Sequence, residues 1–108
     1  MPEAVIVSTA RSPIGRAMKG SLVNVRPDDL TAHIVNACLE KIPAFDRTTA
    51  EDLILGCGQP AGESGYNLAR IVAIQAGMPD VPGVTINRYC SSSLQTIRMA
   101  AHAIKAGE

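Results

Sequence analysis

Cys90 is the residue of this chain best placed to do chemistry, because it stands where a predicted strand gives way to a predicted helix. A β-prone run at residues 84–87 precedes it, and a helical pattern that lasts to Ala106 follows it. A thiol at such a junction faces the first free N–H groups of the helix and their partial positive charge, so its anion is favoured. This arrangement presents a nucleophilic cysteine to a substrate.

The junction alone leaves two interpretations of Cys90 open. A helix N-terminus stabilises a nearby anion by ~0.3–1 kcal/mol, and by up to about 2 kcal/mol in favourable sites. That stabilisation leaves most of the thiol protonated at neutral pH, so useful nucleophilicity still requires a base. On the other interpretation Cys90 is a small residue at a helix start without chemistry, and Ser91, Ser92 and Ser93 are ordinary capping residues.

Neither histidine of the chain is predicted to be that base. His102 lies twelve residues beyond Cys90 on the same predicted helix, which places it about 18 Å away at ~1.5 Å per residue. It belongs to the polar stripe of that helix, so we expect it to face solvent. His33 lies beside the apolar face of an earlier predicted helix, and we expect it to be partly buried or at an interface rather than catalytic.

The sequence gives little support for a cofactor or a metal. Residues 56–61, Gly-Cys-Gly-Gln-Pro-Ala, match the relaxed dinucleotide-binding pattern G-x-G-x-x-A after a predicted strand. Pro60 and the glycines beyond it prevent a helix from starting there, and the acidic residue that should end the next strand is missing. We therefore expect a plain βα loop with Cys57 as a small packing residue. Cys38, Cys57 and Cys90 fit no metal-binding spacing, so we expect no metal site and reduced thiols in a cytoplasmic protein.

Composition and charge argue against several other functions. The 108 residues are enough for one small domain and carry a formal net charge of +0 with dispersed basic residues, so we expect no nucleic-acid or membrane partner. No apolar run approaches the ~20 residues that span a bilayer. A strand predicted to begin next to Met1 leaves no room for a signal or transit peptide. Because Phe45, Tyr66 and Tyr89 are the only aromatic residues, the core must be aliphatic, which suits a parallel α/β sheet.

The elements that must position Cys90 alternate between strands and helices. We predict strands at about residues 4–9, 52–55 and 84–87. Pro27 and the two aspartates after it open the first helix, because proline and acids both suit a first turn, and Pro43 ends it. A second helix covers about residues 67–76, with Gly77 as its C′ residue. The order βαβαβα predicts a parallel sheet with right-handed crossovers.

The helix after Cys90 has a narrow polar stripe and is otherwise apolar. The stripe consists of Gln95, Arg98, His102 and Lys105. A helix with so little polar surface is expected to be buried on most sides. An unpaired strand edge and an uncovered helix face both promote association, so we expect the chain to bind a second copy or another polypeptide.

Four ordered motifs resemble the thiolase family over residues 4–108. Residues 87–95, Asn-Arg-Tyr-Cys-Ser-Ser-Ser-Leu-Gln, resemble its nucleophile segment, whose pattern is Asn-Arg/Lys-x-Cys-(Ala/Gly/Ser)-Ser-(Gly/Ser)-Leu-(Gln/Lys). Residues 5–16 resemble the opening of the family, a strand followed by Ala-Arg-(Thr/Ser)-Pro-Ile-Gly-(Lys/Arg). Residues 67–79 resemble its second helix and Gly-x-Pro exit, and residues 103–108 resemble the exit of the helix that carries the nucleophile.

This resemblance implies an α/β, thiolase-like fold in which residues 1–108 form the N-terminal βαβαβα part of a mixed sheet covered by helices. Later strands and a C-terminal domain would lie outside these residues. The partner would be a second copy in a homodimer or homotetramer, or the remainder of a split thiolase.

The resemblance also implies an activity, that of a 3-ketoacyl-CoA thiolase, an acyltransferase of fatty acid β-oxidation and lipid metabolism. Cys90 would take the acyl group from the ketone carbonyl and pass it to free CoA, or catalyse the reverse condensation, with its backbone N–H helping to hold the thioester oxygen. Coenzyme A and its thioesters would be substrates, with no further cofactor. The motifs of the family's histidine and second cysteine are absent here, so we expect the 108-residue chain alone to be inactive.

Two details bear on the kind of enzyme. Arg88, Ser91 and Gln95 are closer to degradative 3-ketoacyl-CoA thiolases than to biosynthetic acetoacetyl-CoA thiolases, which more often read Asn-Lys-Val-Cys-Ala. Ser93 departs from the glycine of most thiolases, and Cys-Ser-Ser-Ser-Leu also occurs in ketosynthases, which share the fold. The alternatives are therefore a ketosynthase-type condensing enzyme and a catalytically incomplete thiolase-like chain that serves binding or assembly.

Overall fold

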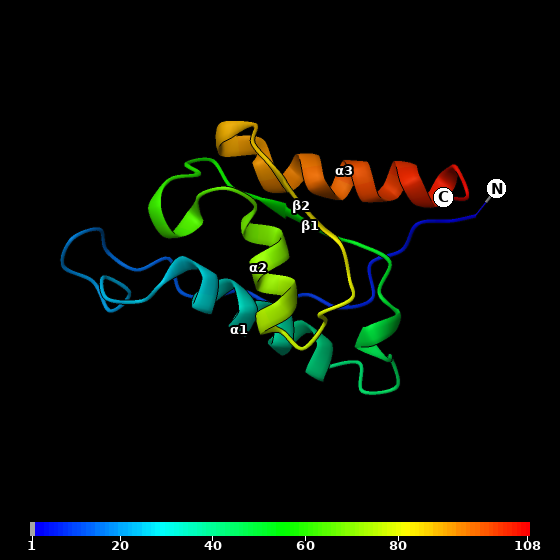
Figure 1. The fold of residues 1–108 in the computed structure, drawn as a ribbon, viewed down its shortest axis with the longest axis horizontal. Helices are drawn as coiled ribbons and strands as arrows, with labels where there is room; N and C mark the ends of the chain where they lie inside the picture. Colours follow the sequence, from blue (N-terminus) through cyan, green and yellow to red (C-terminus); the bar gives the residue numbers. More distant parts are fainter. Residues whose placement is uncertain (1) are drawn as a thin grey trace.

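The computed structural model describes residues 2–108, and its helices and strands alternate from residue 27 onward (Figure 1). The helices are α1 (Pro27–Glu40), α2 (Leu68–Gln75) and α3 (Ser92–Lys105), and the strands are β1 (Leu53–Gly56) and β2 (Gly83–Ile86). Between them lie single-turn 3-10 helices, η1 (Arg47–Thr49), η2 (Gly62–Ser64) and η3 (Tyr89–Ser91). β1 and β2 pair in parallel, with Leu53 opposite Gly83 and Gly56 opposite Ile86. The predicted α/β class and parallel pairing are confirmed.

The strand predicted at residues 4–9 is wrong for the part of the chain that the structure describes. The sheet there has two strands, and this segment is extended chain outside it. Residues 5–7 are 68%, 76% and 69% exposed, and a side-chain bond from Ser8 Oγ to the carbonyl of Cys38, 2.7 Å long, ties the segment to α1. β-propensity expresses packing against neighbouring strands, and no strand within residues 2–108 pairs with this segment.

The sheet lies between two layers of helix. α3 packs on one side of it, α2 packs on the other side, and α1 packs against α2 (Figure 1). The core is densest between α2 and the sheet, where Leu68 and Val72 contact Leu53 and Leu55. A second cluster of aliphatic side chains follows the end of α2. The aliphatic core that the scarcity of aromatic residues predicted is confirmed.

α3 is less buried than its apolar sequence predicts, so the expectation of burial on most sides is wrong for residues 2–108. Ser92 and Thr96 are the buried residues of this helix. Leu94, Ile97 and Ile104 are 70%, 56% and 41% exposed. The reason is geometric: one face of α3 lies on the sheet, and two strands are too narrow to cover the remaining apolar surface.

Hydrogen bonds and a glycine fix α2 against β2. The Thr85 hydroxyl accepts from the Ala69 N–H (2.9 Å) and donates to Asn67 Oδ1 (2.7 Å), so it caps the helix from the neighbouring strand. A Cβ on Gly83 would lie 2.7 Å from the backbone carbon of Ala69, so glycine is required for the helix to approach this closely. Arg70 donates to a backbone carbonyl just before β2 at 3.0 Å. Asn67 and Arg70 thus have the structural roles expected from the sequence.

An ion cluster around the buried Asp28 ties the start of α1 to two other elements. Asp28, 5% exposed, accepts from Arg26 Nε at 3.1 Å and from Gln75 Nε2 at 3.2 Å. Arg26 also reaches Glu63 Oε1 in η2 at 3.1 Å. The hydrogen bond from Arg26 lowers the pKa of Asp28 below its ordinary value of 3.8. Pro27 is the first residue of α1, as predicted, and the ion cluster then fixes this helix end to η2 and α2.

This ion cluster makes the stability of the chain sensitive to acid. Because the folded-state pKa of Asp28 lies below the unfolded value, its contribution is present above pH ~4 and is lost as the pH falls through the folded-state pKa. We expect the thermal midpoint of the parent to fall more than that of Asp28→Asn between about pH 5 and about pH 2.5. Glu40→Gln, at an exposed position, serves as the matched control. An Asp28→Asn variant with the parent's full acid sensitivity would contradict the assignment.

Candidate active site

Cys90 lies where the sequence predicted it, between a strand and a helix. β2 ends at Ile86, the turn η3 follows, and α3 begins at Ser92. The thiol belongs to η3 and is exposed, whereas Cys38 and Cys57 are half-buried. Cys57 packs against the apolar cluster between α2 and the sheet, which agrees with its predicted packing role. The structure therefore singles out Cys90 as the accessible thiol.

The turn that carries Cys90 has an unusual backbone. Tyr89 has a φ of +47°, in the left-handed region that bulky residues rarely adopt, and its ring is 78% exposed. Asn87 Oδ1 accepts from the Tyr89 N–H at 2.9 Å, and the Ser91 N–H donates to the carbonyl of Arg88 at 3.0 Å. Polar contacts thus define the turn, because the exposed ring of Tyr89 is not packed into the core.

Two glycines at the end of β1 make room for this turn. A Cβ on Gly56 would lie 2.6 Å from the backbone nitrogen of Ser93, and one on Gly58 would lie 3.1 Å from the carbonyl oxygen of Tyr89. No α-helix starts in this loop, since α2 begins at Leu68. The pattern that resembled a dinucleotide fingerprint is a βα loop, as predicted, and its first and third residues lie under the turn of Cys90. The spacing of the glycines did not predict this role.

The electrostatic environment of Cys90 is that of a helix N-terminus. Within residues 2–108, the Cys90 N–H makes no hydrogen bond, and no side chain caps the start of α3. Unpaired N–H groups at this end carry partial positive charge and favour an anion beside them. The site can therefore stabilise a thiolate and offer an N–H to a negatively charged oxygen.

Neither histidine is placed to act as a base for Cys90. His102 lies in the last turn of α3 and is exposed, as predicted, so the helix length keeps it about 18 Å from the thiol. His33 lies on α1, which packs on α2, and α2 covers the opposite side of the sheet from α3. It is exposed within residues 2–108, so it is not partly buried there, and the other expectation, that it lies at an interface, stays a prediction.

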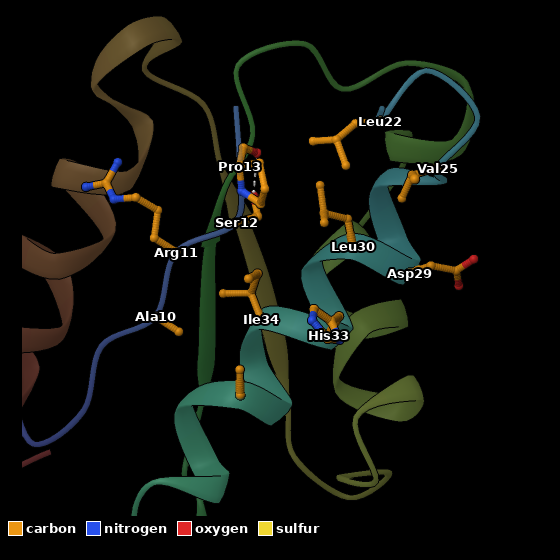
Figure 2. A pocket seen from close by; sticks show the side chains of 11 residues that line it. Ala10, Arg11, Ser12, Pro13, Leu22, Val25, Asp29, Leu30, His33 and Ile34 are labelled. Carbon is orange, nitrogen blue, oxygen red and sulfur yellow. Dashed lines mark hydrogen bonds between the residues drawn. The ribbon is translucent and has the colours of Figure 1, made fainter. Parts of the chain in front are cut away.

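His33 lies on the wall of a groove of about 420 Å³ that remains open within residues 2–108. Figure 2 shows Leu30 and Ile34 pointing from α1 toward the segment of residues 10–13, with His33 beside them. A larger hollow of about 990 Å³ lies between α3 and the side of the sheet on which α3 packs, and it is lined in part by Ile54 and Val84. Cys90 lines neither, so its thiol is presented at the surface.

The described residues contain neither a metal-binding cluster nor a membrane-spanning helix. Among residues 2–108, no group of three or more His, Cys, Asp or Glu side chains is arranged to hold a metal ion. None of the helices described has the length and apolarity needed to cross a membrane.

Comparison with known proteins identifies relatives along nearly the whole chain. The family profile described as "Thiolase, N-terminal domain" matches residues 4–108. The chain is 51% identical over 108 residues to a 3-ketoacyl-CoA thiolase of Bacillus subtilis (strain 168), a match that covers 99% of this chain and 27% of that protein. It is 42% identical over 109 residues to a 3-ketoacyl-CoA thiolase of Citrobacter koseri, covering 100% of this chain and 28% of the relative.

A third relative carries a different substrate in its name. The chain is 47% identical over 109 residues to a β-ketoadipyl-CoA thiolase of Acinetobacter baylyi, covering 100% of this chain and 27% of that protein. The chain therefore spans between a quarter and a third of the length of each of these curated relatives.

The exposure and position of Cys90 predict selective chemical labelling. With limiting iodoacetamide at neutral pH, we expect the folded chain to be modified at Cys90 at least about threefold faster than at Cys38 or Cys57, as measured by peptide mass spectrometry. The same chain unfolded in urea is the control, because the preference for Cys90 should then disappear. Preferential labelling of either half-buried cysteine in the folded chain would contradict the assignment.

Proposed function

Because the chain belongs to the thiolase family, we propose that Cys90 is the nucleophile of an acyltransferase that cleaves 3-ketoacyl-CoA by thiolysis. The observation that carries the proposal is the exposed Cys90 thiol at the start of α3, beside its own unpaired N–H. This thiol stands in the segment of residues 87–95 that resembles the family's nucleophile pattern.

The proposed reaction has two halves that share Cys90. The thiolate attacks the ketone carbonyl, the carbon–carbon bond beside it breaks, and the released two-carbon fragment takes up a proton to become acetyl-CoA. The acyl group stays on sulfur as a thioester until the thiolate of free CoA attacks it, which releases the shortened acyl-CoA and frees Cys90. The unpaired Cys90 N–H supports an oxyanion role, since it can donate to the carbonyl oxygen as negative charge develops there.

The base and the acid of this reaction would have to come from outside residues 2–108. His102 is at the far end of α3 and His33 is on the other side of the sheet from that helix. On the family resemblance, a histidine would activate Cys90 and a second cysteine would handle the substrate proton. Coenzyme A is a substrate in this proposal, and no further cofactor is needed.

The choice among 3-ketoacyl-CoA substrates stays open in this proposal. Two of the relatives are named 3-ketoacyl-CoA thiolases and one is named a β-ketoadipyl-CoA thiolase. The ketosynthase alternative rested on Ser93, which stands in place of the family's usual glycine. Ser93 is exposed, and Gly56 is the glycine that allows the backbones of β1 and α3 to approach closely. A serine at position 93 therefore fits this turn and does not by itself favour a ketosynthase. A cytoplasmic location, with fatty acid β-oxidation as its context, completes the proposal.

Turnover tests the proposal directly. We expect the purified 108-residue chain to cleave acetoacetyl-CoA with added CoA no faster than the buffer blank, because no base accompanies Cys90. Co-expression with the portion of the Bacillus subtilis relative that follows the matched segment should give measurable thiolysis, and Cys90→Ser should remove it. A chain that turns over by itself would show that a base within these residues had been overlooked, and a Cys90→Ser complex that retains activity would refute the proposed nucleophile.

We also propose that the open surface of α3 makes the chain associate. Leu94 and Ile97 lie on that surface at 70% and 56% exposure, beside a sheet with unpaired edges. At micromolar concentration, light scattering after size exclusion should give a mass above the 11.3 kDa of one chain. Leu94→Glu with Ile97→Glu should shift the mass toward the monomer, whereas Arg98→Glu, an exposed position on the polar stripe, should not. A parent chain that is folded and strictly monomeric would contradict this proposal.

A further inference from the structure

The side chain of Ser92 joins two backbone groups that lie on either side of the Arg88–Tyr89 peptide, just ahead of Cys90. Its Oγ accepts from the Arg88 N–H at 2.9 Å and donates to the Tyr89 carbonyl oxygen at 2.7 Å. The residue is 4% exposed, so water does not compete freely for these bonds. This use differs from the helix capping expected of serines at this point, because Ser92 is the first residue of α3 and binds the backbone ahead of the helix.

The two hydrogen bonds of Ser92 Oγ form a clamp on the turn, and the turn needs this clamp because its backbone is strained. A left-handed φ at a residue such as Tyr89 is unfavourable and persists only where the surrounding structure enforces it. The ring of Tyr89 is exposed and contributes little packing. Its N–H donates to Asn87 Oδ1, and its carbonyl accepts from both the Ser92 hydroxyl and the Ser92 backbone N–H, so side-chain and backbone bonds together hold the conformation.

The clamp rests on the end of β1. The position of a Cβ on Gly56 is 2.7 Å from the carbonyl carbon of Ser92 and 3.0 Å from the Cβ of Ser92. Gly58 lies under the Tyr89 carbonyl that accepts from the Ser92 hydroxyl, because a Cβ on Gly58 would lie 3.1 Å from that carbonyl oxygen. The Ser92 side chain is thus enclosed between the turn and the strand, where it has little freedom to choose other partners.

We infer that Ser92 is a positioning residue that holds Cys90 and its free N–H at the positive end of α3, with Gly56 as the seat of this clamp. The inference rests on the proposed role of Cys90 as nucleophile and extends it to a residue that touches no substrate. Without the Ser92 hydroxyl, the Arg88 N–H loses its acceptor and the Tyr89 carbonyl keeps only the Ser92 backbone N–H. Tyr89 then relaxes toward negative φ, and the thiol moves away from the unpaired N–H groups.

The chain offers matched controls on both sides of Ser92. Ser91 and Ser93 are exposed, and the two clamp bonds are made by Ser92 Oγ, so Ser91→Ala and Ser93→Ala remove a hydroxyl without removing the clamp. Gly62→Ala controls for lost stability: Gly62 has a φ of +56°, so the variant is strained, but an added Cβ meets nothing within 4 Å.

The experiment measures the rate of Cys90 alkylation by iodoacetamide as a function of pH in folded chains, with Cys57 in the same molecule as internal reference. We expect Ser92→Ala and Gly56→Ala to slow alkylation of Cys90 at neutral pH by about threefold or more, and to move its pH profile toward that of the urea-unfolded chain. Ser91→Ala, Ser93→Ala and Gly62→Ala should keep the parent rate and profile. Loss of stability alone would not move the Cys90 profile while leaving the Cys57 rate unchanged.

The outcomes separate this inference from the proposed function. If Cys90 of the parent reacts no faster than in the unfolded chain, the proposed nucleophile itself fails. If the parent is reactive and Ser92→Ala shows the same rate and profile, only the positioning role is overturned. Should Ser92→Ala fail to fold by circular dichroism, Asn87→Ala tests the same turn from an exposed position, and a parent-like profile there would overturn the inference.

Discussion

The contact between the end of β1 and the first turn of α3 is the constraint on which the presentation of Cys90 depends. Parallel pairing places the ends of β1 and β2 at the same edge of the sheet, so the loop after one strand meets the turn after the other. Gly56 lets the two backbones come together where any side chain would collide with Ser93. Gly56 and Gly58, which matched the dinucleotide-binding pattern, therefore make room for a turn of the same chain.

The two sides of the sheet differ in how completely they are packed, and Cys90 stands at the border between them. α2 is fixed to β2 by the hydroxyl of Thr85 and by the close approach at Gly83, and it buries most of the core. α3 has one face on the sheet and leaves Leu94 exposed. A thiol at this border is held by the packed side of the domain and remains accessible from the open side.

Local chemistry was the part of the structure that the sequence could predict. Pro27 and Gly77, whose effects act within a few residues, marked the start of α1 and the end of α2, and the alternation of strand and helix located Cys90. The parallel pairing of β1 and β2 followed from the alternation of strand and helix, but whether each predicted strand has a neighbour could not be read from its own residues. The strand at residues 4–9 was therefore wrong: its propensity could be seen, but the lack of a neighbour within residues 2–108 could not. The same limit concealed the role of Ser92, because its enclosure depends on Gly56 in another element.

The distance in sequence between Gly56 and Ser93 also orders events during synthesis of the protein. Non-local contacts of this kind form only after the intervening chain has been made and the loop between them has closed. β1 leaves the ribosome well before residues 87–92, so the turn can rest on Gly56 only after both segments have been made. The nascent chain consequently carries Cys90 without this turn, and the geometry that presents the thiol at the start of α3 arises only when this part of the domain has folded.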